Sequence, residues 1–248
     1  SAVCVPSIGK VFDSLGLPGT GRKAAVRSMD KIAMKERFIA NGVPTANFQV
    51  CYSLEDAKNA AEKIGYPLAV KASDSSGSRG ISKVQEISEM GSAYMAAFNE
   101  SKSKLVIVEE WLEGLEFGAQ AIVVGDEIVD CIFHNDSTTM PPVVVPIGHS
   151  VPFNREDLVN DSIEAIAASI KSLGIRQTIA NVDLIATDSG IKIIEVGARM
   201  GGTCIPELCS LITGVDFYEI AIRLSLGEEI SGPFERRKGF WAACLIRS

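Results

Sequence analysis

The sequence predicts an α+β protein with two lobes, each built around a mixed sheet. Apolar residues make up 46% of the 248 residues, which is enough for a large core. Segments with helical and strand periodicity alternate along the chain, but two pairs of neighbouring strands are joined by short turns. This order fits two α+β lobes better than one parallel βαβ array.

Helices and strands alternate through the first 110 residues. Residues 24–40 have a helical pattern that stops at Asn41-Gly42. Ser53 is the expected N-cap of a second helix, which ends at Gly65. The other elements expected here are strands at 46–50, 67–71, 81–84 and 104–110, and a helix from Ser88 to about residue 99.

The rest of the chain begins with strands at 116–124 and 127–134, joined by a Gly125-Asp126 turn. A proline-rich loop is expected at 135–153. The elements expected after this loop are a helix at 155–172, a hairpin at 178–197, helices near 205–213 and 216–226, and a strand near 239–246.

Composition excludes several classes of protein. Acidic residues exceed basic ones, 31 against 24, so the net charge of −7 argues against a nucleic-acid partner. The longest uncharged stretch, 137–154, contains four prolines and cannot span a membrane. Two histidines and six cysteines without a C-x-x-C pair argue against zinc. Scattered thiols and the lack of a signal peptide predict a cytoplasmic protein.

The hairpin at 178–197 brings two acids into register. A three-residue loop ending at Gly190 would pair Thr187 with Ile191. With that register Asp183 faces Glu195 on one side of the sheet, at about 5 Å between Cβ atoms.

This pair of facing acids predicts a cation site. Their repulsion would be about 3 kcal/mol at an effective dielectric constant near 20, and a divalent cation such as Mg²⁺ would remove it. Two alternatives stay open at this point. One carboxylate could point to solvent, or Lys192 or an arginine could neutralise the pair.

Two further segments have the composition of ligand-binding loops. The run of small and polar residues at 72–80 follows Lys71, and its backbone N–H groups could cradle phosphate oxygens, although it matches neither common phosphate motif. The alternative is a flexible surface loop. The segment 106–116 runs from an apolar strand into acids, where a flat heterocycle and a sugar could bind. Taken by itself, this segment is better explained as a strand with a solvated acidic end.

Taken in order, these segments resemble the ATP-grasp enzymes, particularly the D-alanine–D-alanine ligase branch. The resemblance begins at Ser28-Met29-Asp30-Lys31 and Gly42-Val43-Pro44 and covers about residues 22–226. It implies an α+β ATP-grasp fold with ATP bound between the sheets of two lobes. The domains implied are a remnant of a preceding domain and linker at 1–21, an N-terminal lobe at 22–110, and a C-terminal lobe with the metal site at 111–248.

The resemblance also assigns residues to ATP and to Mg²⁺ (or Mn²⁺). Trp111 is expected to pack in the hinge between the lobes. The residues implied for the phosphates are Lys31, Lys71, Ser76, Gly77, Ser78, Arg79 and Gly80. Those implied around adenine and ribose are Glu109, Glu110, Trp111, Leu112 and Glu116, and the metal ligands are Asp183 and Glu195.

The sequence departs from the pattern of the D-alanine ligase branch at three places, and these departures argue against D-alanine as the substrate. Gly197 stands where that branch has Asn, Asn181 stands where it has Arg, and the phosphate loop differs. The run 195–202 resembles amino-acid ligases and carbamoyl-phosphate-synthase-like enzymes more closely. In those, Arg199 would hold the substrate carboxylate or acyl phosphate, which makes Arg199 and Lys71 the candidate catalytic residues. The alternative for Arg199 is a salt bridge to Glu195 or Glu207.

The activity implied is ligation of a small-molecule carboxylate to an amine through an acyl phosphate, with release of ADP and phosphate. A carboxyphosphate-forming unit and a non-catalytic ATP-binding module stay open as alternatives. His134 and His149 flank the proline-rich loop and could line the acceptor site, but ordinary loop histidines are the better explanation. The short ends leave open a homo-oligomer or missing flanking domains.

Overall fold

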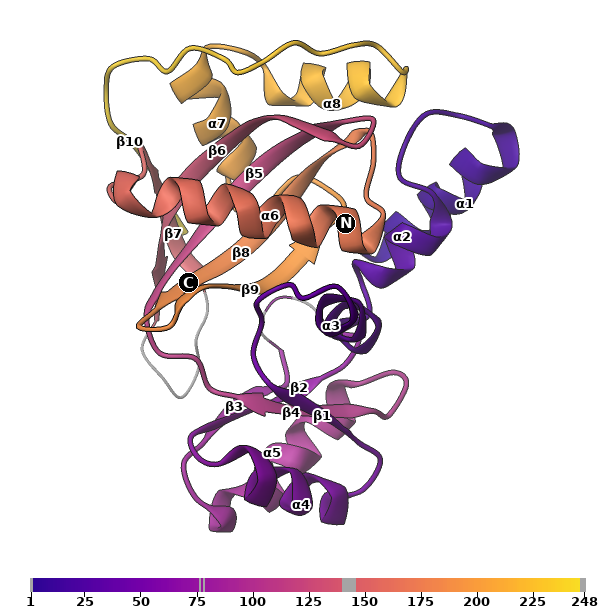
Figure 1. Ribbon diagram of the computed structural model, residues 1–248, viewed down its shortest axis with the longest axis vertical. Coiled ribbons are helices and arrows are strands. Elements are labelled where there is room, and N and C mark those ends of the chain that lie inside the picture. The colour runs from indigo at the N-terminus through magenta and orange to yellow at the C-terminus, as the bar shows by residue number, and fades with distance from the viewer. Residues whose placement is uncertain (1, 76, 78, 140–145, 246–248) are drawn as a thin grey trace.

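The computed structural model describes residues 2–75, 77, 79–139 and 146–245, and it has two lobes, each with its own sheet (Figure 1). The α+β class predicted from the sequence is confirmed. The mixed sheets expected from the sequence are wrong, because every strand pair within the described residues is antiparallel. In the four-stranded sheet, for example, the strands joined through a helix run in the same direction, but another strand inserts between them.

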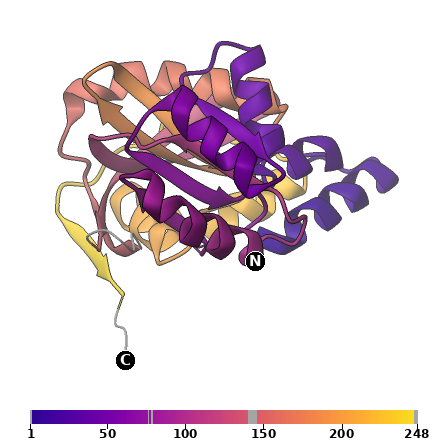
Figure 2. The same ribbon diagram turned by 90° about the horizontal axis from the view of Figure 1, so that it is seen from below.

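The smaller lobe is a four-stranded sheet of order β1-β4-β2-β3 covered by two helices. Its elements are β1 (Phe48–Cys51), α4 (Leu54–Ile64), β2 (Leu68–Ala72), β3 (Ile81–Val84), α5 (Ile87–Glu100) and β4 (Val106–Glu110). Figure 2 shows both helices on the face that points away from the larger lobe. Small residues of α4, such as Ala57 and Ala61, pack in the core with Leu68 and Val108 of the strands. Ser53 caps α4 as predicted, because its side chain accepts a hydrogen bond from the backbone of Asp56.

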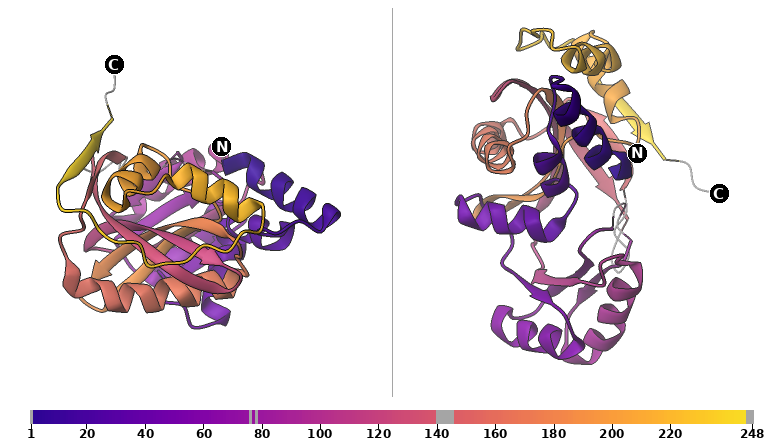
Figure 3. Two further views of the ribbon diagram at one scale, coloured as in Figure 1. Left: turned by 90° about the horizontal axis from the view of Figure 1, so that it is seen from above. Right: turned by 90° about the vertical axis from the view of Figure 1, so that its right-hand side faces the viewer.

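The larger lobe is a six-stranded sheet of order β10-β7-β6-β5-β8-β9. Its strands are β5 (Leu115–Val124), β6 (Glu127–Thr138), β7 (Pro146–Val151), β8 (Thr178–Thr187), β9 (Gly190–Gly197) and β10 (Trp241–Cys244). Its helices are η2 (Glu156–Leu158), α6 (Val159–Leu173), α7 (Ile205–Thr213) and α8 (Phe217–Ser225). Helix α6 packs on one face, while α7 and α8 cover part of the other face (Figure 3).

The N-terminal segment consists of η1 (Ala2–Cys4), α1 (Val5–Leu15), α2 (Arg22–Arg27) and α3 (Lys31–Ala40). The single helix expected at 24–40 is therefore wrong. It breaks before Lys31, because the side chain of Asp30 accepts hydrogen bonds from the backbone of Ile32 and Ala33 and starts a new helix. Met34 and Phe38 of α3 pack into the core beneath the larger sheet.

The proline-rich loop expected at 135–153 is also wrong over much of its length. Strand β6 continues to Thr138, and β7 pairs with it between Asn135 and Thr138. Two prolines border β7, at its first residue, Pro146, and directly after its last, Pro152, which are positions where a strand tolerates proline. His134 and His149 therefore lie on paired strands.

The smaller lobe is attached to the larger one through two chain segments. One segment runs from α3 to β1 and the other from β4 to β5, and the backbone N–H of Glu110 donates to the carbonyl of Asn47 where they pass each other. The first segment is also bonded to the edge strand β9, through Ile193 N–H to Pro44 and through the Thr45 hydroxyl to Ile193. Among the described residues, no helix has the length and apolar character needed to cross a membrane.

Candidate functional site

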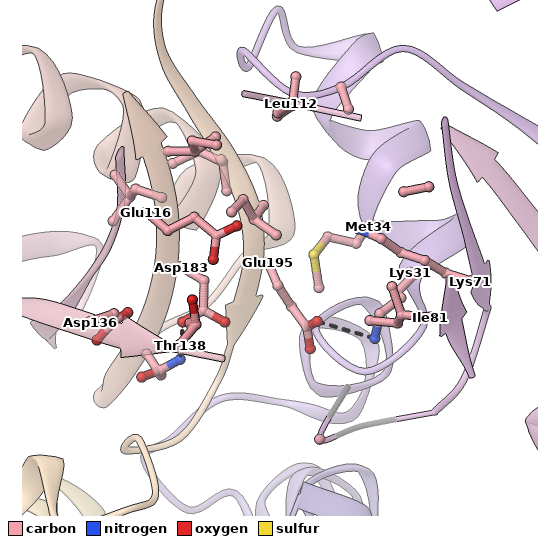
Figure 4. A pocket seen from close by; sticks show the side chains of 18 of the residues that line it. Lys31, Met34, Lys71, Ile81, Leu112, Glu116, Asp136, Thr138, Asp183 and Glu195 are labelled. Atoms are coloured by element: carbon pink, nitrogen blue, oxygen red, sulfur yellow. Dashed lines mark hydrogen bonds and ion pairs between the residues drawn. The ribbon is translucent and has the colours of Figure 1, made fainter. Parts of the chain in front are cut away.

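A cavity of about 400 Å³ opens between the two lobes, a size typical of small-molecule sites. It is lined by the smaller sheet and α3 on one side and by the larger sheet on the other (Figure 4). The lysines of the cavity wall, Lys31, Lys35 and Lys71, lie on the side of α3 and β2, which also carries Glu109 and Glu110 of β4. The larger sheet contributes the acids Glu116, Asp136, Asp183 and Glu195.

Strand pairing places a row of polar side chains across the floor of this cavity. Gly118 of β5 pairs with His134 on one side and Asp183 on the other, and Asp183 pairs with Glu195. Side chains of directly paired residues share a face of the sheet. Gly118 is required in the middle of the row, because a Cβ atom there would overlap the His134 ring.

Asp183 faces Glu195 as expected, but the strand register predicted next to the turn is wrong. Thr187 pairs with Gly190, one residue out of the predicted alignment. A β-bulge at Asp183/Leu184 leaves Ile194 as an extra residue and restores the expected pairing of the two acids.

Asp183 lies in an environment that opposes its negative charge. Burial, then the neighbouring acids Glu195 and Asp136, raise the pKa of the Asp183 carboxyl to about 7. Asn181 donates a hydrogen bond to it at 2.9 Å. Two oxygen donors held together against their own repulsion fit a hard divalent cation, so Asp183 and Glu195 could hold Mg²⁺.

Lys31 rather than Lys192 is the lysine that contacts this pair. Its Nζ lies 3.1 Å from Glu195 Oε2 and donates to the Ser75 carbonyl at 2.8 Å (Figure 4). Lys192 instead lies 3.3 Å from Glu110. Arg199 lines the cavity and donates to the Met200 carbonyl at 2.6 Å, and in the described part of the chain it forms no ion pair with Glu195 or Glu207.

Lys71 and Glu109 form a buried ion pair with a third member, Lys35, that sequence reasoning missed. Lys35 Nζ lies 2.8 Å from Glu109 Oε2 and donates to Thr45 at 3.0 Å. Burial opposes ionisation of Glu109, but Lys71 and Lys35 lower its pKa to about 2. The same ion pair raises the pKa of Lys71 against the opposing effect of its burial. The available signal was spacing, since Lys35 follows Lys31 by one helical turn.

The segment between the lobes contributes Glu110, Trp111, Leu112 and Glu116 to the cavity wall. Trp111 packs in the hinge, with Lys83 Nζ 4.8 Å from the centre of its ring. Burial raises the pKa of Glu116.

The expected phosphate loop is described in part. Gly77 and Arg79 line the cavity. Gly80 accepts a hydrogen bond from Ala72 N–H, which closes the base of the loop. Ser76 and Ser78 lie outside the described residues.

The two histidines form a cluster with Asp136, which the sequence reasoning also missed. The Nδ1 atoms of His134 and His149 lie 2.8 and 2.6 Å from the same oxygen, Asp136 Oδ1. His149 Nε2 lies 2.7 Å from Thr203 Oγ1. Both histidines are buried, so the expectation of ordinary loop histidines is wrong. The spacing of His134 and Asp136, two residues apart on one strand, was the available signal.

This cluster has the composition of a metal site but the spacing of a hydrogen-bonded triad. Its three donor atoms lie within 4.8 Å of one another. Ligands about 2.1 Å from one cation stand about 3.0 Å apart at octahedral angles and about 3.4 Å apart at tetrahedral angles. The observed nitrogen-to-oxygen distances of 2.6 and 2.8 Å match hydrogen bonds better.

A cleft between two antiparallel α+β lobes, with lysines on one wall and paired acids on the other, is the arrangement of the ATP-grasp class. Residues 30–232 match the family model of the carbamoyl-phosphate synthase L chain, ATP-binding domain. Because this match covers most of the chain, the protein belongs to that family, and the ATP-grasp fold expected from the sequence is confirmed.

Individual relatives are more distant. The chain is 24% identical over 227 residues to the uncharacterized protein y4rH of Sinorhizobium fredii, covering 90% of this chain and 47% of y4rH. It is 24% identical over 240 residues to a D-alanine–D-alanine ligase of Stutzerimonas stutzeri, covering 88% and 71% of the two chains. The crystal structure of phosphoribosylglycinamide synthetase from Anaerococcus prevotii is similar at 32% identity and a TM-score of 0.73, covering 92% and 57%. The chain therefore spans about half the length of two of these three proteins.

Proposed function

We propose that this chain is the ATP-binding part of a ligase that joins a small-molecule carboxylate to an amine through an acyl phosphate, releasing ADP and phosphate. The observation that carries the proposal is the opposition of Lys31 and Lys71 to Asp183 and Glu195 across one cavity. That arrangement suits a nucleotide triphosphate with its cation. The ligase relatives support the reaction class.

On this proposal, the ammonium groups of Lys31 and Lys71 would contact the ATP phosphates. The loop including Gly77, Arg79 and Gly80 would cover them. Glu109, Glu110, Leu112 and Glu116 would surround adenine and ribose, next to Trp111. The lysines would offset the charge that builds up on the phosphoryl group during its transfer.

Asp183 and Glu195 would hold Mg²⁺ or Mn²⁺ in this proposal. The raised pKa of Asp183 supports the assignment, because burial and then repulsion from Glu195 and Asp136 oppose its charge, and a bound cation would offset both effects. When bound, the cation would neutralise negative charge on the phosphates. Lys31, which now contacts Glu195, would then be released toward those phosphates.

Arg199 would bind the substrate carboxylate or its acyl phosphate. Its side chain lines the cavity on the segment that follows β9. A planar guanidinium offers two parallel N–H donors to such an anion. The acceptor amine would enter from the same side, next to the loop that contains Gly202 and Thr203. The six free cysteines support a reducing compartment, and the proposal places the reaction in the cytoplasm.

The family match favours one second candidate, a unit that phosphorylates bicarbonate to carboxyphosphate. It would use the same nucleotide and cation residues. The two candidates differ in the acceptor for the γ-phosphoryl group.

ADP release from the purified chain separates the candidates. A panel of amino acids, supplied both as carboxylates and as amines, should raise ADP release only when both substrates are present. Release with bicarbonate alone would favour the second candidate instead. ATP binding without turnover under every condition would contradict both and leave a non-catalytic module.

The metal assignment has its own test. Asp183→Asn should lower any such turnover by about 100-fold or more, since it removes one ligand of the cation that offsets the transferred charge. Asp188→Asn makes the same change at an exposed position in the hairpin turn and should leave turnover unaltered. Equal activity of the two variants would show that Asp183 is not a ligand.

A further inference from the structure

A chain of hydrogen bonds connects Asp136, a half-buried residue of the cavity wall, through His149 to Thr203. Asp136 Oδ1 lies 2.6 Å from His149 Nδ1, and His149 Nε2 lies 2.7 Å from Thr203 Oγ1. His149 is 5% exposed, whereas Thr203 is exposed and lines the cavity. An acid, an imidazole and a hydroxyl are thus connected in the order found where a hydroxyl is activated for proton transfer.

The direction of these hydrogen bonds follows from the charge of Asp136. Burial opposes its ionisation, but the hydrogen bonds from His134 and His149 lower the pKa of Asp136 to about 2, so it is a carboxylate. A carboxylate only accepts hydrogen bonds, so both histidines donate through Nδ1. His149 Nε2 is then left as an acceptor, and the hydroxyl of Thr203 donates to it.

His134 also donates a hydrogen bond to the Asp136 carboxylate. Its ring stands at 87° to the ring of His149, and both Nδ1 atoms converge on one oxygen. With Asp136 held from two sides, the imidazole of His149 is fixed in both its orientation and its protonated nitrogen.

The backbone holds Thr203 in a conformation that a β-branched residue rarely adopts. Its φ angle is +52°, and that of the next residue, Cys204, is +65°. Such a conformation is strained and persists where the surroundings fix it. Here the surroundings are the hydrogen bond from Gly201 N–H to Gln120 and the start of α7. In this conformation the Thr203 hydroxyl lies 2.7 Å from His149 Nε2 at the wall of the cavity.

We propose that Thr203, acting through His149 and Asp136, removes a proton from the acceptor amine as it attacks the acyl phosphate. This inference rests on the proposed ligase function. The amine nitrogen bonds to the acyl carbon, and the bond from that carbon to the phosphate oxygen breaks, releasing phosphate with its electron pair. Thr203 Oγ takes a proton from the nitrogen and passes its own to His149 Nε2. The imidazolium, held by Asp136, later returns its proton to water.

Hydroxylamine provides the discriminating experiment. It is a strong nucleophile but a weaker base than an alkyl amine, so the proton that its nitrogen loses during the attack is acidic enough to pass directly to water. Hydroxylamine therefore traps an acyl phosphate as a hydroxamate without a positioned base. A carboxylate and amine pair from the substrate panel is assayed for amide and for hydroxamate formation. For Thr203→Val the ratio of amide rate to hydroxamate rate should fall by about 100-fold or more. Asp136→Asn should lower the same ratio, because the His149 ring would lose its carboxylate partner.

Two variants separate chemistry from structure. Thr203→Ser keeps the hydroxyl and should restore the ratio to within about tenfold of the unmodified chain, well above that of Thr203→Val. Thr178→Val makes the same change on β8, outside the cavity lining, and should leave the ratio unchanged. Thermal unfolding of each variant checks that it is folded.

Each remaining outcome overturns the proposal. If Thr203→Val loses both rates equally, Thr203 only shapes the site. If its ratio is unchanged, the amine loses its proton elsewhere. If the unmodified chain forms neither amide nor hydroxamate with any pair, the proposed function itself fails, and the relay fails with it.

Discussion

Asp183 is a half-buried carboxyl that keeps its proton to a higher pH than an ordinary aspartate. Its pKa of about 7, raised by burial and then by Glu195 and Asp136, lies well above the value of an unfolded chain. The folded state therefore binds a proton that the unfolded state has already lost. The stability that this group contributes is present below the ordinary pKa of aspartate and is lost as the pH rises through about 7.

Asp183→Asn should therefore stabilise the metal-free protein. We expect a gain on the order of 3 kcal/mol in the free energy of unfolding at pH 8 and a smaller gain at pH 5. Urea unfolding at the two pH values measures this, with Asp188→Asn as the control at an exposed position. A gain that is larger at pH 5 than at pH 8 would contradict the assigned pKa. Added Mg²⁺ should stabilise the unmodified chain but not the variant.

Glu109 shows the opposite shift, because Lys35 and Lys71 stabilise its charge. Lys35→Met should destabilise the fold by about 3 kcal/mol, since it leaves a buried carboxylate with one partner instead of two. A depressed carboxyl pKa supports stability that is lost as the pH falls through it, so acid unfolding of the variant should begin at a higher pH.

Urea and acid titrations followed by circular dichroism measure both effects of Lys35→Met. The matched control is Lys63→Met on the exposed face of α4, which should stay within about 0.5 kcal/mol. If the two lysine variants unfold alike, the buried pair does not support the fold.

At the scale of single elements, α3 depends on the cap provided by Asp30. Asp30→Ala should cost about 1 kcal/mol, because two backbone N–H groups lose their acceptor. It should also weaken ATP binding, since Lys31 is the first residue of this helix. Asp216 caps α8 in the same way but away from the cavity. Asp216→Ala should lower the stability by about as much as Asp30→Ala does, but it should leave the affinity for ATP unchanged. Thermal unfolding and nucleotide titration measure the two effects.

Local sequence signals predicted well those helices and strands whose ends and periodicity depend only on neighbouring residues in the sequence. The cap at Ser53, the strand at 81–84 and the helix at 205–213 all match, because capping residues and side-chain periodicity are local. Strand β7 was missed because its bordering prolines indicate a loop as readily as the ends of a strand. The bulge at Ile194 was missed because pairing with β8, not the sequence of β9, produces it.

The residues of the candidate site can be divided in the same way, into those that could be brought together from the sequence and those that meet only in the folded protein. The pairing of the two hairpin acids was predicted correctly only because the bulge at Ile194 offsets the one-residue error in the register expected from the turn. Asp136, His149 and Thr203 could not be brought together, because they belong to β6, β7 and the loop before α7, which meet only in the folded sheet. The roles proposed for the nucleotide and cation residues, and the domain limits at residues 22 and 110, stay predictions.

At the scale of the whole molecule, nucleotide binding should require both lobes. A non-hydrolysable ATP analogue with Mg²⁺, at about 100 times its Kd, should add about 2.7 kcal/mol to the free energy of unfolding. For a chain of this length that corresponds to a rise in Tm of about 5 to 10 °C. Lys71→Met in one lobe and Glu195→Gln in the other should each reduce the rise, whereas Lys63→Met should not. A rise that survives both changes would place the nucleotide elsewhere.

The paired segments that attach the smaller lobe also have a mechanical consequence. A body held at one point can swing in any direction, but a body held at two neighbouring points turns mainly about the line that joins them. The bond between Glu110 and Asn47 keeps the two attachments side by side, and the bonds of Pro44 and Thr45 to β9 anchor one of them to the larger sheet. We therefore expect the smaller lobe to rotate mainly about the line through its two attachments, which would change the width of the cavity. The contacts of Lys31 with Ser75 and of Lys35 with Glu109 also join α3 to the smaller lobe and would resist that rotation.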